Sequence, residues 1–116
     1  MMSVRSPTHT TATVRWMKPT DLPAMTELEL VTQDFPWNED QLVRSLTKNG
    51  LVVLVAETSR DGVVGFLTYK LPVTSKADPT RIVRGGVAPV FRNKGVARTL
   101  LSDMRKKVKT FKWPSI

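Results

Sequence analysis

The segment from Arg92 to Arg98, RNKGVAR, combines residue types that could hold a phosphate group. It follows the apolar stretch RIVRGGVAP and precedes a helical pattern, so it would form the loop at the beginning of a helix. Backbone N–H groups there have no acceptor within the helix, and the helix dipole makes them a site for anions. Gly95 lacks a Cβ that would obstruct a phosphate, and Arg92, Lys94 and Arg98 add positive charge. Together these residues could cradle a pyrophosphate.

Two better-known phosphate motifs are absent from the sequence. There is no G-x-x-x-x-G-K-[ST], which argues against a P-loop NTPase, and no G-x-G-x-x-G after a first strand, which argues against a dinucleotide fold. A basic loop before a helix is also more often a solvated terminus than a ligand site. On the residues alone, both interpretations stay open.

The net charge of +8 is concentrated in the last part of the chain. Residues 1–91 carry 10 Lys/Arg and 9 Asp/Glu, whereas residues 92–116 carry 8 Lys/Arg and one acid, Asp103. This distribution indicates a polyanionic partner, either a nucleic acid or a phosphorylated cofactor. Because the tail also fits a solvated helix face followed by core aromatics, we expect nucleic acid not to be the main partner.

Composition limits the class of protein. A chain of 116 residues forms one domain at most, and the absence of cysteine excludes disulfides, a zinc ribbon and a cysteine nucleophile. No apolar run approaches the length of about 20 residues that spans a bilayer. The first residues, MMSVRSPTHTT, lack the apolar core of a signal peptide. We therefore expect a cytoplasmic protein with a disordered polar tail at residues 1–11, no membrane association and no bound metal.

The elements that would position the loop follow from hydrophobic patterning. A strand is expected over residues 12–17, helices over about 21–33 and 38–49, a hairpin over 51–71, a strand over 80–89 and a helix over 95–109. The order β-α-α-β-β-β-α predicts an α+β fold with a mixed or mostly antiparallel sheet and helices on both faces.

Several local signals mark the boundaries of these elements. Asn38 and Gln41 have the spacing of a capping box, and Gly50 follows the end of that helix. The turn SRDG carries a glycine where a positive φ is expected. Gly85 and Gly86 lie inside a predicted strand, where glycines often indicate a bulge or the close approach of a ligand or another backbone.

The stretch from Arg92 to Ala97 resembles the Q/R-x-x-G-x-G/A signature of the GCN5-related N-acetyltransferase (GNAT) family, with Ala97 at the final position. GGVAP resembles the V-x-P-like end of the preceding strand, and the order of elements is also similar to that of the family. The resemblance covers residues 12–110 and implies that acetyl-CoA is the cofactor. The residues that it assigns to the cofactor are Gly85, Gly86, Val87, Arg92, Asn93, Lys94, Gly95, Val96, Ala97 and Arg98.

The N-terminal half is similar to the RimI-like branch, which acetylates the N-terminal amine of a ribosomal protein. The similarity lies in TDLPAMTELE, in FPW and in the acid-rich helix start that follows. It implies a protein N-terminal amine as acceptor and assigns Phe35, Pro36 and Trp37 to the border of the acceptor groove. A small-molecule amine stays open.

The family's general base and general acid lie on a fifth strand and a fourth helix, which have no counterpart before Ile116. We therefore expect a truncated form or fragment that lacks the C-terminal strand-helix-strand portion, with unassigned catalytic residues. Tyr69, Glu57 and His9 are weak candidates because strand-end Glu and half-buried Tyr are usually structural. The exposed edge of the last strand would invite pairing with a second copy.

Two alternatives to an active enzyme stay open. The chain could be a catalytically incomplete module that binds CoA. It could also be a basic protein that contacts RNA or the ribosome, since Phe111 and Trp113 alternate with Lys109 and Lys112 and aromatic residues among cations can stack on bases.

Overall fold

A computed structural model describes residues 11–48, 50–70 and 80–110 of the chain. The predicted order of helices and strands is confirmed, with two short 3-10 helices in addition. The elements are β1 (Thr13–Trp16), η1 (Pro19–Asp21), α1 (Leu22–Thr32), α2 (Glu39–Lys48), β2 (Leu51–Thr58), β3 (Gly62–Lys70), β4 (Arg81–Val87), η2 (Pro89–Phe91) and α3 (Val96–Thr110). The tail predicted at the N-terminus, apart from Thr11, lies outside the described residues, as do Phe111 and Trp113.

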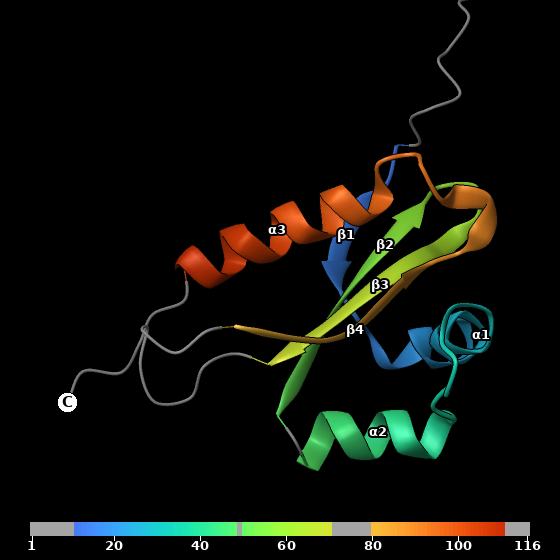
Figure 1. Ribbon diagram of the computed structural model, residues 1–116, viewed down its shortest axis with the longest axis vertical. Helices are drawn as coiled ribbons and strands as arrows, with labels where there is room; N and C mark the ends of the chain where they lie inside the picture. The colour runs from blue at the N-terminus through green and yellow to red at the C-terminus, as the bar shows by residue number, and fades with distance from the viewer. Residues whose placement is uncertain (1–10, 49, 71–79, 111–116) are drawn as a thin grey trace, which may run out of the picture.

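The four strands form one sheet in the order β1-β2-β3-β4, and every pairing is antiparallel. Helix α3 lies along one face of the sheet, and α1 and α2 cover the other (Figure 1). The α+β class and the helices on both faces are therefore confirmed. Among the described strands β4 pairs only with β3, so pairing of its other edge with a second copy stays a prediction.

Two apolar clusters lie on opposite faces of the sheet. Leu54 and Tyr69 pack beneath α3, whereas Val55 and Phe66 pack against α1 and α2. Successive residues of a strand point to opposite faces, so a strand covered on both sides needs a continuous apolar run. This explains why β2 reads LVVLVA without a polar residue.

The local signals for turns and caps are also confirmed. Asn38 Oδ1 accepts the Gln41 N–H at 2.9 Å, and Gln41 Oε1 accepts the Asn38 N–H at 2.9 Å, as a capping box requires. Gly50 and Gly62 both have left-handed φ angles, of 64° and 76°. Helix α1 begins differently, since a 3-10 turn precedes it and the Asp21 side chain makes no cap bond to it.

Strand β4 contains a bulge, which lies at Val83 and not at the glycines. The pairing with β3 shifts so that Ile82 faces Tyr69 and Arg84 faces Thr68, which leaves Val83 as the extra residue. Gly86 serves a close approach instead. A Cβ at Gly86 would lie 2.5 Å from the Thr32 Oγ1 and 2.6 Å from its Cβ, so the neighbour that requires glycine is α1 of the same chain.

Replacing Gly86 with alanine is expected to destabilise the protein by about 1–3 kcal/mol, because the new methyl group would push the end of α1 away from β4. Thr32→Gly in the same chain would remove the obstructing atoms and recover part of this loss. Urea unfolding of the single and double variants measures both effects. Equal stability of Gly86→Ala and the wild type would contradict the tight contact.

Candidate cofactor-binding site

The loop between β4 and α3 is built from two residues in left-handed conformation. Asn93 has a φ of 62° and Gly95 a φ of 85°. Left-handed φ is the region that only glycine, and less readily asparagine, adopts at low cost. Arg92 Nε donates to the Val87 carbonyl at 3.1 Å and so ties the loop to the end of β4. The loop is therefore a defined turn that places the N-terminus of α3 beside the end of the strand.

The backbone at the beginning of α3 is suited to an anion. The Thr99 N–H donates to the Gly95 carbonyl at 3.0 Å. The N–H groups of Val96, Ala97 and Arg98 precede this bond and have no acceptor within the helix. A depression of about 430 Å³ opens at this point. Of the seven predicted loop residues, Lys94 does not line this depression. The other six do, namely Arg92, Asn93, Gly95, Val96, Ala97 and Arg98.

A second hollow, of about 410 Å³, runs along β4 and contains the glycine segment. Gly85 and Gly86 line it, together with Thr32 of α1 and Leu101 of α3. Three residues line both hollows, namely Val87, Arg92 and Ala97. The two hollows therefore adjoin and together form one groove. Both predicted cofactor segments, which are apart in the sequence, line this groove.

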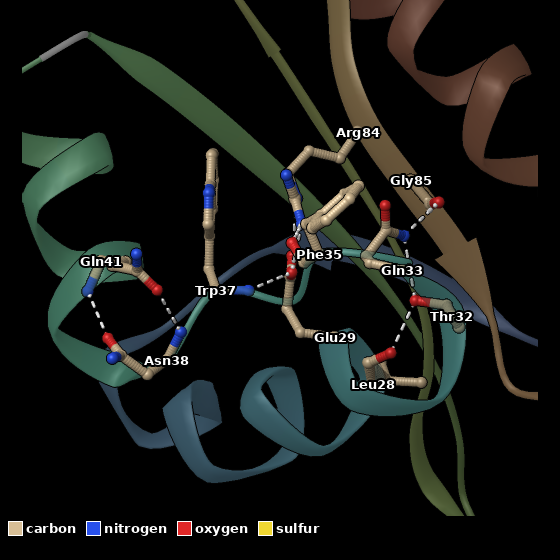
Figure 2. A network of polar contacts seen from close by, with 10 residues as sticks. All are labelled: Leu28, Glu29, Thr32, Gln33, Phe35, Trp37, Asn38, Gln41, Arg84 and Gly85. Atoms are coloured by element: carbon tan, nitrogen blue, oxygen red, sulfur yellow. Dashed lines mark hydrogen bonds and ion pairs between the residues drawn. The ribbon is translucent and has the colours of Figure 1, made fainter.

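Gln33 lies beside this groove and connects α1 to β4. Its Nε2 donates to the Gly85 carbonyl at 3.0 Å and to Thr32 Oγ1 at 3.0 Å (Figure 2). The Thr32 hydroxyl in turn donates to the Leu28 carbonyl at 2.6 Å. The position of the glycine segment relative to α1 is thus set by a side chain that the sequence analysis did not identify.

A buried ion pair that was not predicted from the sequence also joins α1 to β4. The Glu29 side chain is 0% exposed and accepts two bonds from Arg84, from Nη2 at 2.6 Å and from Nε at 3.0 Å (Figure 2). Glu29 falls four residues after Met25, on the apolar face of α1. A carboxylate at such a position is rarely buried without a partner, which is the signal that could have found it.

The same pair holds the FPW segment that the resemblance assigned to the acceptor groove. Glu29 Oε1 accepts the Trp37 N–H at 2.8 Å, and Arg84 donates to the Phe35 carbonyl at 2.8 Å. The Arg84 guanidinium also lies 4.0 Å from the centre of the Trp37 ring. Trp37 packs against the core, whereas Pro36 is exposed and the Phe35 side chain is 87% exposed. The segment is fixed next to β4 with Phe35 facing outward.

The structure gives Tyr69 a place in the core. It is fully buried beneath α3, and its hydroxyl has no hydrogen-bond partner among the described residues. Burial, and to a lesser degree the charge of Asp103, raises the pKa of Tyr69 to about 12. Burial of the phenol in this cluster supports a packing role for Tyr69. His9 lies outside the described residues.

Glu57 belongs to an ion-pair cluster around Arg15. Its Oε1 accepts from Arg15 Nε at 2.6 Å, and Asp21 accepts from Arg15 Nη1 at 2.8 Å and from the Lys18 N–H at 2.7 Å. The hydrogen bonds from Arg15 lower the pKa of both carboxyl groups. A carboxylate held in its charged form is a weaker base, so this cluster supports a structural role for Glu57.

Acid stability should depend on this cluster. Both pKa values are lowered by folding, so the stabilisation is present above the ordinary carboxyl pKa of about 4 and is lost as the pH falls through the folded values. Asp21→Asn should lower the free energy of unfolding at pH 7 by about 1.5–3 kcal/mol, the range for a hydrogen bond to a charged group. Asp21→Asn should also make the fall of the free energy of unfolding below pH 4 less steep. Urea unfolding from pH 7 to pH 2 measures this, with the exposed Asp34→Asn as control; parallel pH curves for Asp21→Asn and the wild type would contradict it.

Among the described residues, no cluster of three or more His, Asp or Glu side chains has the arrangement of a metal site. The described helices include none that is long and apolar enough to span a membrane.

Comparison with known proteins places the fold. No family model matches the chain, and no curated protein matches it in sequence. The solved structures give clear matches. The ribosomal-protein-S18-alanine N-acetyltransferase of Escherichia coli aligns with a TM-score of 0.70 and 20% identity, over 85% of this chain and 60% of that one.

Two further structures have the same arrangement. Ard1 of Thermoplasma volcanium aligns with a TM-score of 0.72 and 18% identity, over 84% of this chain and 64% of that one. A GNAT family N-acetyltransferase of Escherichia coli, solved in complex with CoA, aligns with a TM-score of 0.68 and 22% identity, over 88% of this chain and 58% of that one. The chain thus spans less than two thirds of the length of each of these three proteins. From β1 to α3, it has the fold of the corresponding part of the GNAT N-acetyltransferases.

Proposed function

We propose that this chain forms the cofactor-binding part of an acetyl-CoA-dependent N-acetyltransferase that acts on a protein N-terminal amine in the cytoplasm. The observation that carries the proposal is the continuous groove in which the left-handed loop at Asn93 and Gly95 meets the edge of β4 at Gly85 and Gly86. The fold supports it, because one protein with this arrangement was solved in complex with CoA.

The residues of the groove fit acetyl-CoA. The N–H groups of Val96, Ala97 and Arg98, with the Arg92 and Arg98 side chains nearby, would hold the pyrophosphate. The segment from Gly85 to Val87 would run beside the pantetheine, where the glycines keep the groove open. Acetyl-CoA supplies the acetyl group as an activated thioester. The contribution of this chain is to bind the cofactor and orient it toward the FPW segment.

The acceptor is proposed from the FPW segment. The exposed Phe35 projects next to β4 from a backbone that Glu29 and Arg84 hold in place. An exposed aromatic side chain on a backbone that is held next to β4 suits contact with the first residues of a peptide. A ribosomal protein is the acceptor that the resemblance favours.

A second candidate function is a CoA-binding module without turnover. Acetyl transfer requires a neutral amine, so a base must remove a proton. Tyr69 is buried, and the Glu57 carboxylate is engaged with Arg15. These two observations favour the module, since neither of the described candidates is available as an acid or base.

Two measurements on the full chain separate the candidates. Millimolar CoA should raise the melting temperature, because a ligand at 100 times its Kd stabilises a protein by about 2.7 kcal/mol. Acetyl transfer to a peptide with a free N-terminal amine is then followed by mass spectrometry. Transfer supports the enzyme, and stabilisation without transfer supports the module. No stabilisation by CoA would overturn both.

A further inference from the structure

The solvent-facing side of α3 carries a line of cations that the proposed function does not use in full. Arg98, Arg105 and Lys109 are all exposed. With Ser102 they occupy positions i, i+4, i+7 and i+11 of the helix. At 3.6 residues per turn these four residues fall on one narrow face, so they form a stripe about 17 Å long. We define these four residues as the α3 stripe.

The charge of the α3 stripe is not offset by nearby acids. The one acidic residue of α3 is Asp103, which lies outside the stripe and pairs with Lys107 at 2.8 Å. Lys107 also lies 5.2 Å from the ring of Trp16, on the side toward β1. No ion pair between described residues involves Arg98, Arg105 or Lys109. The stripe therefore presents three cations to solvent along a rigid line.

The surroundings of α3 leave this line accessible. No other described helix lies on the face of the sheet that α3 covers, and no described element covers the outer side of α3 (Figure 1). Its apolar side is already used, since Val96, Leu100 and Met104 are buried against the sheet. A helix that lies on a membrane needs a free apolar face, so the arrangement favours a polyanion in solution over a lipid surface.

We infer that the α3 stripe binds the phosphate backbone of double-stranded RNA. Charge complementarity carries the choice of a nucleic acid, because three exposed cations along about 17 Å of one helix face match a line of backbone phosphates. Single strands are usually held by aromatic side chains, and the α3 stripe has none. A duplex recognised through its backbone fits better. This inference shares Arg98 with the cofactor proposal but does not depend on it, and its test contains no CoA.

Ser102 favours RNA over DNA. It is exposed and lies between Arg98 and Arg105 on the same face of α3. Double-stranded RNA is recognised largely through phosphates and 2′-hydroxyl groups across its shallow minor groove. A serine hydroxyl flanked by two cations provides one group for the 2′-hydroxyl and two for the neighbouring phosphates. DNA lacks the 2′-hydroxyl and would lose that contact.

The test is fluorescence anisotropy of a labelled RNA duplex of about 16 base pairs, titrated with the full chain at 50–200 mM salt. Three phosphate contacts predict a slope of log K against log salt of about −2.7, or roughly 40-fold weaker binding at 200 mM than at 50 mM. Arg98→Gln/Arg105→Gln/Lys109→Gln should weaken binding at least tenfold and remove most of the slope. Circular dichroism checks that this triple variant and the control variant are folded.

The matched control is Arg44→Gln/Arg60→Gln/Lys70→Gln. It also removes two arginines and one lysine, but at exposed positions on α2, the β2–β3 turn and β3. It should retain the affinity and the slope of the wild type. If both triple variants weakened RNA binding equally, the proposal that the α3 stripe is the binding site would be overturned, because net charge alone would then determine the affinity. Equal binding of a DNA duplex of the same sequence, or tighter binding to phosphatidylserine vesicles, would overturn the assignment to RNA.

Discussion

Replacing Glu29 with alanine is expected to destabilise the protein by about 3–5 kcal/mol, the usual cost of removing one partner from a buried ion pair. Glu29 is fully buried, and its loss would leave the half-buried Arg84 guanidinium without its counter-charge and the Trp37 N–H without its acceptor. Because small domains have a total stability of about 5–15 kcal/mol, this single change would remove a large share of it. Urea unfolding followed by tryptophan fluorescence measures it.

Two controls show whether the pair or the helix position is responsible. Glu27→Ala removes an exposed carboxylate from the same helix and should cost less than about 0.5 kcal/mol. Glu29→Met/Arg84→Met replaces both charges with apolar groups and should be more stable than Glu29→Ala, because buried pairs are often neutral against apolar replacements. A loss below about 1 kcal/mol for Glu29→Ala would contradict the role of the pair.

Replacing Gly95 with valine is expected to weaken CoA binding by at least about ten- to hundredfold. Gly95 has a φ of 85°, which a β-branched residue adopts only with strain of about 1–3 kcal/mol. The loop would relax to a negative φ and turn the N–H groups of Val96 and Ala97 away from the pyrophosphate. The strain of the binding conformation alone would lower the affinity for CoA roughly ten- to hundredfold. The lost hydrogen bonds would lower it further. Isothermal titration calorimetry measures the affinity.

Gly62→Val provides the matched control. Gly62 also has a left-handed φ, of 76°, at the start of β3, and a Cβ there would meet no atom within 4 Å. Both variants therefore carry similar backbone strain, but only Gly95 belongs to the candidate site. Gly62→Val should bind CoA with the affinity of the wild type. Unchanged affinity in Gly95→Val would exclude the loop as the phosphate site.

The sequence predicted what depends on local patterning. Hydrophobic periodicity located every strand and long helix, and the spacing of Asn38 and Gln41 gave the cap of α2. These features depend on neighbours within a few residues. The sequence also located the loop before α3, whereas its role in holding a pyrophosphate stays a prediction.

Contacts between distant parts of the chain could not be predicted in this way. Glu29 and Arg84 are 55 residues apart, and nothing in either local pattern identifies the other as its partner. The partner of the close approach at Gly86 could not be identified for the same reason, since Thr32 belongs to another element. The continuity of the groove likewise appears only when α1, β4 and α3 are brought together.

The measurement that tests the account most directly is a titration of the ¹⁵N-labelled full chain with CoA, followed by amide chemical shifts. Binding in the groove predicts saturable shifts that are largest for the amides of Gly95 to Arg98 and of Gly85 to Val87, with little change in β1 and α2. The absence of saturable shifts at millimolar CoA, or shifts centred away from the loop and β4, would contradict the proposed site.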